Sequence, residues 1–183
     1  VEIGLGNIWL QDLIRGSLSR FTFEANAGSP VWSPDGSRVA YTSSEIQGTD
    51  FHLYQKPANG AGQAELILKG GVNPFATDWS RDGKFLVFSQ AAERSGNDLW
   101  LLPMEGERKP VSLLRTAFNE VQGQFSPDGK WVAYTSDEGG VLQVYVMAMP
   151  AIPSAARAGA GGKFQISTAG GIQPRWNRDG KEL

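Results

Sequence analysis

Cysteine is absent from this chain of 183 residues, and histidine occurs once, as His52. Without cysteine, the protein forms no disulfide and no thiolate metal site. A Ser-His-Asp triad needs a histidine base, but His52 stands in the apolar segment 51–54, where a half-exposed strand residue is expected instead. We therefore predict that this chain is not an enzyme and carries no catalytic residue.

Long apolar runs and concentrated charge are also missing. No stretch of about 18 apolar residues is present, so no membrane-spanning helix is predicted, and the first residues lack the basic and apolar regions of a signal peptide. The 17 Lys and Arg residues and 19 Asp and Glu residues give a net charge of −2. Because the sequence contains no cluster of Lys and Arg residues that could bind a phosphate backbone, we expect no nucleic-acid partner.

Motifs for nucleotide, acyl-transfer and metal chemistry are absent as well. The glycine-rich run 159–162 lacks the Lys-Ser/Thr that follows in a phosphate-binding loop, and no Gly-x-Ser-x-Gly run occurs. The pair Asp137-Glu138 before two glycines resembles half of a calcium loop. Calcium takes six to eight oxygens, so a solvated turn is favoured, and no metal or cofactor is predicted.

What the chain does contain is a repeated turn. The run Val-Trp-Ser-Pro-Asp-Gly at 31–36 returns in variant form at 78–83, 124–129 and 175–180. The aspartates of these runs are 47, 46 and 51 residues apart. A fixed period of roughly 20–50 residues indicates stacked units that bury their apolar faces against one another.

Turn geometry explains the repeated residues. Proline presets φ at the second position of a type I turn, Asp suits the third position, and the glycine that follows takes the left-handed conformation. The result is a tight hairpin with a glycine bulge. The residues with this structural role are Asp35, Gly36, Asp82, Gly83, Asp128, Gly129, Asp179 and Gly180.

Each unit is predicted to hold four short strands. The first ends at the aromatic residue before the turn, and the second, as in 38–43, 85–89 and 131–136, is rich in β-branched and aromatic residues. Four antiparallel strands in about 45 residues form the blade of a β-propeller. The predicted fold class is all-β, with about four blades' worth of four-stranded antiparallel blades in this chain.

These units are predicted to form one domain over residues 1–183. The Pro- and Gly-rich stretch 150–162 has no periodicity and is predicted as an inserted flexible loop. The half units at the two ends favour a ring completed by further sequence; a ring closed within one chain and a ring of two chains stay open as alternatives. The unit bounds are about 1–28 (half), 29–70, 71–117, 118–170 and 171–183 (half).

The pattern aromatic-Ser-Pro-Asp-Gly, followed by Ala-Tyr-Thr-Ser and by strands such as Asp98-Leu99-Trp100, resembles the WD40-like PD40 repeats of the TolB-like propeller family. Such repeats build the propellers of TolB, of prolyl-oligopeptidase-type peptidases and of sensor regions in bacterial Ser/Thr kinases. The resemblance implies a bacterial, non-catalytic propeller that binds a protein or senses a ligand, in a periplasmic or other extracytoplasmic location. The alternative is the gating propeller of a serine peptidase.

Propeller geometry places a binding site, if there is one, at the mouth of the central channel. The residues nearest to the channel come from the innermost strand of each blade and from the loop before it. A polar set of mixed charge suits a polar peptide, a protein segment or a small ligand, and a water-lined channel is the alternative. The candidates are Asn73, Asp78, Asn119, Glu120, Gln122, Gln124, Gln173 and Arg175.

Overall fold

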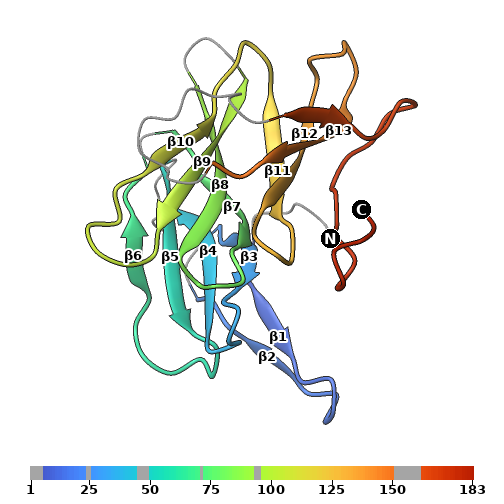
Figure 1. Cartoon of the computed structure of the whole chain (residues 1–183). Coiled ribbons are helices and arrows are strands. Elements are labelled where there is room, and N and C mark those ends of the chain that lie inside the picture. The colour runs from blue at the N-terminus through green and yellow to red at the C-terminus, as the bar shows by residue number, and fades with distance from the viewer. Residues whose placement is uncertain (1–5, 24–25, 45–49, 71, 93–95, 151–161) are drawn as a thin grey trace. The chain divides into compact units, whose positions relative to one another are not determined.

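The computed structural model describes residues 6–23, 26–44, 50–70, 72–92, 96–150 and 162–183. These residues form three sheets of four strands and one sheet of two strands (Figure 1). They contain no helix that is long and apolar enough to cross a membrane. The predicted all-β class with four-stranded antiparallel blades is confirmed. Of the predicted loop 150–162, residues 151–161 lie outside the described residues.

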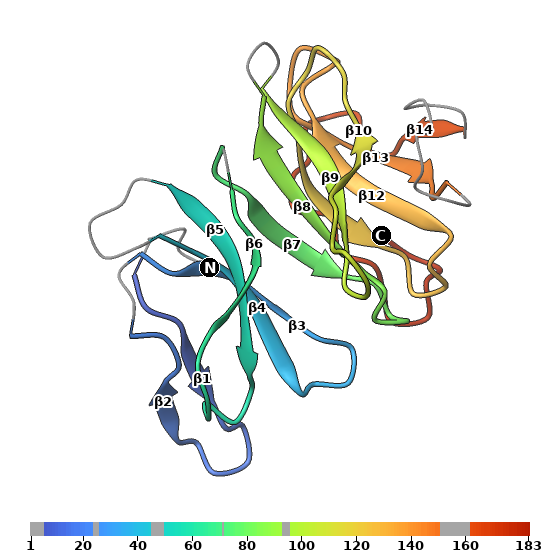
Figure 2. The same ribbon diagram turned by 90° about the vertical axis from the view of Figure 1, so that its left-hand side faces the viewer.

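The chain divides into two compact units, residues 1–76 and 77–183, and each is described here by itself. The first unit holds the two-stranded sheet and one four-stranded sheet, drawn from blue to teal in Figure 2. Its strands are β1 (Trp9–Gln11), β2 (Leu18–Arg20), β3 (Gly28–Trp32), β4 (Arg38–Ser44), β5 (Phe51–Pro57) and β6 (Glu65–Leu68).

The core of the first unit forms where the β1–β2 hairpin meets β4. Ile8 and Phe21 pack against Val39 and Tyr41, and the rings of Phe21 and Tyr41 meet edge to face with their centroids 6.1 Å apart. The side chain of Lys56 reaches Phe21 as well, and its Nζ donates to the Phe21 carbonyl at 3.2 Å. The β-branched and aromatic run of β4 is thus buried along nearly its whole length.

The second unit contains two four-stranded sheets, in the strand orders β7-β8-β9-β10 and β11-β12-β13-β14. The boundary between the units falls within β7. The strands are β7 (Phe75–Trp79), β8 (Phe85–Ala91), β9 (Asn97–Pro103), β10 (Val111–Leu114), β11 (Glu120–Phe125), β12 (Trp131–Ser136), β13 (Gln143–Ala148) and β14 (Lys163–Gln165).

These two sheets share one apolar core. Val87 and Leu99 of the first sheet lie in the same buried cluster as Phe125 and Tyr134 of the second. A Cβ atom on Gly123 would lie 2.9 Å from Val87 Cγ2. Glycine at this position therefore lets the backbone of β11 approach β8 closely.

The repeated turn has the predicted geometry in all four of its copies. In each copy the glycine donates its N–H to the carbonyl three residues earlier, as Gly129 does to Ser126 at 2.9 Å. The predicted left-handed glycines are confirmed, with φ of 69° at Gly36, 78° at Gly83, 70° at Gly129 and 73° at Gly180.

The serine of the repeated turn has a role that the sequence did not reveal. Ser126 Oγ donates to Asp128 Oδ1 at 2.6 Å and accepts from the Trp131 N–H at 3.0 Å. Ser33 and Ser80 make the same pair of bonds in their own turns. One hydroxyl thus joins the turn aspartate to the start of the second strand.

The repeat also predicts a first strand over residues 174–176, ending at Trp176 before the fourth turn, and this prediction is wrong. The described residues there have no strand assignment, because a strand needs a neighbour that exchanges backbone hydrogen bonds with it. The segment instead reaches β11 through side chains: Trp176 Nε1 donates to the Gln124 carbonyl at 3.2 Å, and the Gln173 N–H donates to Gln122 Oε1 at 2.7 Å.

Candidate functional site

The eight predicted channel-mouth residues fall into separate groups. Asn73 belongs to the first unit, where it is exposed, has a φ of 45°, and accepts from the Phe51 N–H at 3.4 Å. The other seven belong to the second unit. Five of them, which we call the inner-strand surface, lie on or beside β7 and β11: Asp78, Gln122, Gln124, Gln173 and Arg175.

Gln122 fixes the centre of the inner-strand surface. Its backbone is left-handed, with a φ of 59°, at the register shift between β11 and β12, and such a bulge redirects a side chain. Its Oε1 accepts from Thr135 Oγ1 at 2.9 Å and from the Gln173 N–H at 2.7 Å. The equivalent residues of two other units, Ser29 and Gln173, are left-handed too.

Gln124 and Asp78 join β11 to β7. Gln124 Nε2 donates to the Thr77 carbonyl at 2.7 Å, and Asp78 Oδ2 accepts from the Phe125 N–H at 2.8 Å. Burial raises the pKa of Asp78 to about 6, although this backbone bond and the positive charge of Arg175 pull the pKa down. Both side chains are therefore already committed to holding the strands.

Gln173 and Arg175 are the exposed members of the inner-strand surface. Arg175 Nη1 donates to the Pro174 carbonyl at 3.0 Å, while the amide of the Gln173 side chain makes no hydrogen bond with any other described residue. These two side chains are the ones that a ligand could reach.

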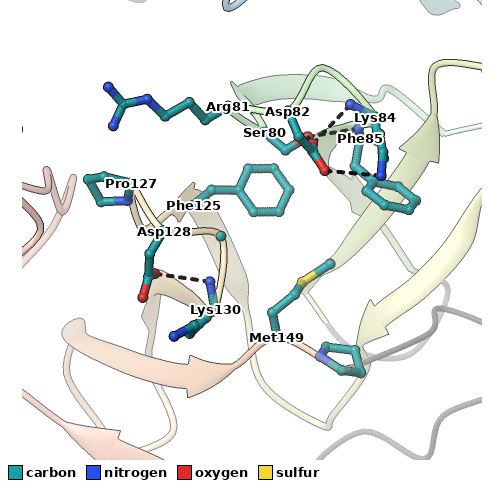
Figure 3. A pocket seen from close by; sticks show the side chains of 12 residues that line it. Ser80, Arg81, Asp82, Lys84, Phe85, Phe125, Pro127, Asp128, Lys130 and Met149 are labelled. Atoms are coloured by element: carbon teal, nitrogen blue, oxygen red, sulfur yellow. Dashed lines mark hydrogen bonds and ion pairs between the residues drawn. The ribbon is translucent and has the colours of Figure 1, made fainter.

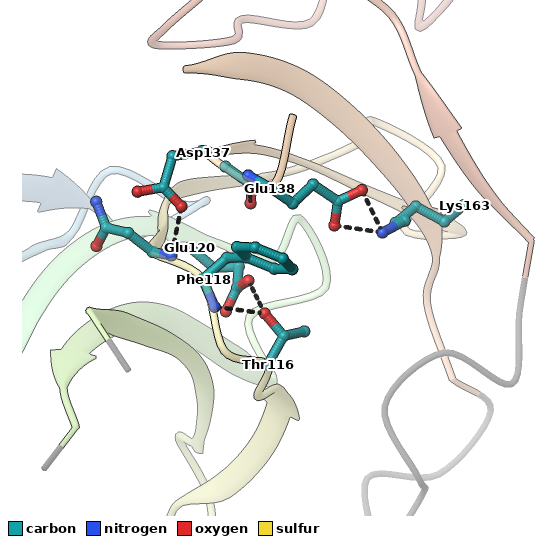
Figure 4. Close-up of polar contacts among 8 residues, drawn as sticks. Thr116, Phe118, Glu120, Asp137, Glu138 and Lys163 are labelled. Carbon is teal, nitrogen blue, oxygen red and sulfur yellow. Dashed lines mark hydrogen bonds and ion pairs between the residues drawn. The ribbon is translucent and has the colours of Figure 1, made fainter. Parts of the chain in front are cut away.

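Glu120 lies apart from this surface, in a buried environment at the start of β11 (Figure 4). Thr116 Oγ1 donates to Glu120 Oε1, but Oε2 is buried and has no hydrogen-bond partner in the described part of the chain. Burial, helped by the negative charges of Asp98 and Glu138, raises the pKa of Glu120 to about 7.

Tyr134 is buried in the same region. Its hydroxyl also has no partner among the described side chains and backbone groups. Burial and the charges of Glu138 and Glu120 raise the pKa of Tyr134 above its ordinary range. A carboxyl oxygen and a phenol are thus left unpaired in one region.

Asn119, the last candidate, organises the loops around Glu120. Its Oδ1 accepts from the N–H and from Nδ2 of Asn97 at 2.8 and 2.9 Å, and its N–H donates to Asp137 Oδ1 at 2.9 Å. Glu138 in turn pairs with Lys163, whose Nζ is 2.6 Å from Glu138 Oε1. Within the described residues, no group of three or more acidic or histidine side chains is arranged to hold a metal ion.

The comparisons with known proteins agree with this blade architecture. Residues 29–183 match the family described as PD40, TolB beta propeller domain. The chain belongs to this family. The match includes the three four-stranded sheets and the four repeated turns, so the PD40 resemblance is confirmed.

Two solved TolB structures are similar to this chain in fold. TolB from Acinetobacter baumannii has a TM-score of 0.70 and 23% identity, over 87% of this chain and 37% of that chain. A protein assigned as TolB from Agrobacterium tumefaciens has a TM-score of 0.70 and 19% identity, over 82% of this chain and 56% of that chain.

A sequence relative comes from a different functional class. Tricorn protease homolog 1 of Streptomyces coelicolor is 28% identical over 103 residues, which is 55% of this chain and 10% of that protein. The present chain therefore spans about a tenth of that relative and, at most, 56% of the two TolB chains. Membership of the PD40 family assigns the fold, and the same fold carries unrelated activities.

Within the PD40 repeat, Glu120 stands where the other units have Ala27, Pro74 and Gly171. This contrast was available from the sequence once the turns were aligned. Its surroundings were not, because nothing in the sequence connects Thr116, Tyr134 or Glu138 with Glu120.

Proposed function

We propose that this PD40 propeller chain is a non-catalytic binding module, and that it recognises a polypeptide through its inner-strand surface. The observation that carries the proposal is the bond from the Gln173 N–H to Gln122 Oε1, which holds the exposed segment of Gln173 and Arg175 beside β11. Gln124 and Asp78 in turn bond β11 to β7. Preorganised polar groups bind a ligand with a smaller loss of conformational freedom. An amide and a guanidinium suit the carbonyl and carboxylate groups of a polypeptide.

The environment of the single histidine supports the absence of catalysis. His52 is buried in β5, not half-exposed as predicted, and its Nδ1 accepts from the Gly70 N–H at 3.1 Å. A general base must reach the proton of its substrate, whereas this nitrogen is already bonded within the blade.

Two settings suit such a module. One is the sensor region of a bacterial Ser/Thr kinase or regulator, and the other is a TolB-like periplasmic protein. A second candidate function, the propeller of a serine peptidase, is favoured by the tricorn protease homolog among the sequence relatives. The gene sequence around this segment distinguishes the settings, since a peptidase requires a nucleophile domain encoded with the propeller.

Selection from a phage library of random dodecapeptides tests the binding function. We expect the selected peptides, measured free in solution by fluorescence polarisation, to bind with a Kd below about 1 mM. Arg175→Glu is expected to weaken binding about tenfold, while Arg178→Glu, an exposed control three residues away, leaves it unchanged. Equal effects of the two variants, or no peptide in this range, would overturn the proposal.

A hydrolysis assay tests the absence of catalysis. We expect no turnover of fluorogenic casein or of p-nitrophenyl acetate above the rate in buffer. Turnover that His52→Ala abolishes would show that the chain is an enzyme.

A further inference from the structure

A hollow of about 600 Å³ opens at the turn end of the second unit (Figure 3). It lies between the β7–β8 turn and the β11–β12 turn, at the opposite end of β11 from Glu120. Its lining includes Phe85, Phe125 and Met149, and in Figure 3 the Phe125 ring and the Met149 side chain face the same space. We call it the turn-end hollow; it contains none of the predicted channel-mouth residues.

The apolar lining is fixed by the core beneath it. Phe125 is buried in the core cluster, and the half-buried Phe85 and Met149 pack against that cluster. The third and fourth turns lie closer together than the two turns beside the hollow, since a Cβ on Gly180 in the fourth turn would lie 3.4 Å from Pro127 Cδ in the third. The hollow is thus a preformed apolar pocket, in the size range that takes small ligands or side chains.

Charged side chains line the hollow around this apolar surface. Arg81, Lys84 and Lys130 contribute three positive charges against the two negative charges of Asp82 and Asp128. Lys84 is partly neutralised, because its Nζ lies 3.8 Å from Asp82 Oδ2.

The two aspartates are committed to their turns. Asp82 Oδ1 accepts from Ser80 Oγ and from the Lys84 N–H, and Asp128 Oδ1 accepts from Ser126 Oγ and from the Lys130 N–H. The side chains of Arg81 and Lys130 are exposed and form no hydrogen bond or ion pair with any described residue. The excess charge at the hollow is therefore positive and accessible.

We propose that the turn-end hollow binds an acidic peptide segment, with one apolar side chain against Phe85, Phe125 and Met149 and flanking carboxylates on Arg81 and Lys130. Charge complementarity selects the acidic partner, since unpaired guanidinium and ammonium groups favour carboxylates. A polypeptide supplies apolar and acidic groups on one strand.

This proposal concerns a second surface and does not depend on the inner-strand surface. The probe is an acetylated and amidated hexapeptide of sequence Asp-Glu-Leu-Phe-Asp-Glu. Its control is the isosteric neutral peptide Asn-Gln-Leu-Phe-Asn-Gln. Binding is followed on the full chain by fluorescence polarisation and by backbone amide shifts in NMR spectra.

We expect the acidic peptide to bind with a Kd below about 1 mM and to shift the amides of Lys84, Phe85 and Lys130. The neutral peptide is expected to bind about tenfold more weakly. Raising the salt concentration should weaken the acidic peptide alone, because exposed charges are screened.

A pair of double variants locates the site. Arg81→Glu with Lys130→Glu is expected to weaken the acidic peptide about tenfold or more. The matched control is Arg178→Glu with Lys181→Glu, which reverses the equivalent charges of the fourth turn, outside the hollow, and should leave binding unchanged.

Three results would overturn the turn-end proposal: no binding of the acidic peptide, equal weakening by both double variants, or loss of binding with Arg175→Glu instead. The last result would transfer the peptide to the inner-strand surface and support the proposed function. Loss with the Arg81 and Lys130 variants alone would support the turn-end hollow, whatever the fate of the inner-strand surface.

Discussion

At the turn end of β11, Asp128 is exposed to solvent, whereas Glu120 is buried at the other end of the same strand. Bonds from Ser126 and from the Lys130 N–H lower the pKa of Asp128. Burial raises the pKa of Glu120 to about 7, despite its bond from Thr116. Hydrogen bonds in a solvated turn stabilise the charged form of a carboxyl group, but the bonds from Thr116 do not offset the burial of Glu120.

The two ends also differ in how they repeat. The turn end has the same turn in each repeat. Hydrogen bonds within the turn lower the pKa of Asp35 to about 2, and such bonds lower the pKa of Asp82 as well. The opposite end changes from unit to unit, with Ala27, Pro74 and Gly171 in the place of Glu120. The repeated end forms the hairpin turns, whereas at the variable end one unit alone has an ionisable residue in this position, the buried Glu120.

The largest expected effect on stability comes from replacing the buried carboxyl group of Glu120 with an uncharged amide. In the folded chain the pKa of Glu120 is raised from 4.5 to about 7, so its contribution to stability is lost as pH rises between these values. Glu120→Gln removes this loss. Urea unfolding measures the free energy of unfolding of both proteins. We expect the variant to be more stable than the parent by about 1–3 kcal/mol at pH 8, and the two values to become equal near pH 4.

The matched control at the turn end should show the opposite sign. The folded-state pKa of Asp128 is lowered, so its ionised form stabilises the chain near neutral pH, and this contribution is lost in acid. Asp128→Asn should therefore be less stable than the parent at pH 7, with a difference that shrinks as pH falls. A parallel pH dependence for Glu120→Gln and Asp128→Asn would contradict the comparison.

The serine of the turn should produce the next largest effect. Ser126→Ala removes two hydrogen bonds and leaves the Trp131 N–H without the hydroxyl that it bonds. We expect a loss of about 1–2 kcal/mol in the free energy of unfolding. Ser37→Ala, which removes an exposed hydroxyl that also bonds a turn aspartate, should cost less than about 0.5 kcal/mol. Equal losses would remove the distinction between the buried and exposed hydroxyls.

The smallest of these effects concerns the turn glycine. Gly36 has a φ of 69°, and a Cβ there would meet nothing within 4 Å, so a side chain is opposed by backbone conformation alone. Gly36→Val should lower the free energy of unfolding by about 1 kcal/mol. Gly36→Asn should cost less, because asparagine tolerates the left-handed region. An unchanged Tm for the valine variant would refute the turn assignment.

The sequence predicted the turn end better than the opposite end, for a physical reason. The turn depends on residues within six positions of one another, so the period and the left-handed glycines could be read directly. The bonds of Ser126 are equally local, but Asp128 and Gly129 already account for the repeated pattern, so the pattern alone does not indicate these bonds.

The environment of Glu120 depends on the folded chain, in which Asp98, Tyr134 and Glu138 come from other strands and loops. The framework of Gln122 likewise rests on Thr135 and on Gln173, which is 51 residues away in sequence. Such pairings leave no periodic signal, so the candidate residues could be named while their partners could not. Whether the candidates bind a ligand stays a prediction.

The bonds between successive strands of the inner-strand surface also have a consequence for folding. Thr77 Oγ1 donates to the Gly123 carbonyl at 2.9 Å, and Gln124 Nε2 donates back to the Thr77 carbonyl at 2.7 Å. The two sheets of the second unit thereby stabilise each other, as neighbouring repeats of a solenoid do. If one of these two sheets opens, the other loses hydrogen-bond partners, so local unfolding should spread between them and their amides should lose protection against exchange together.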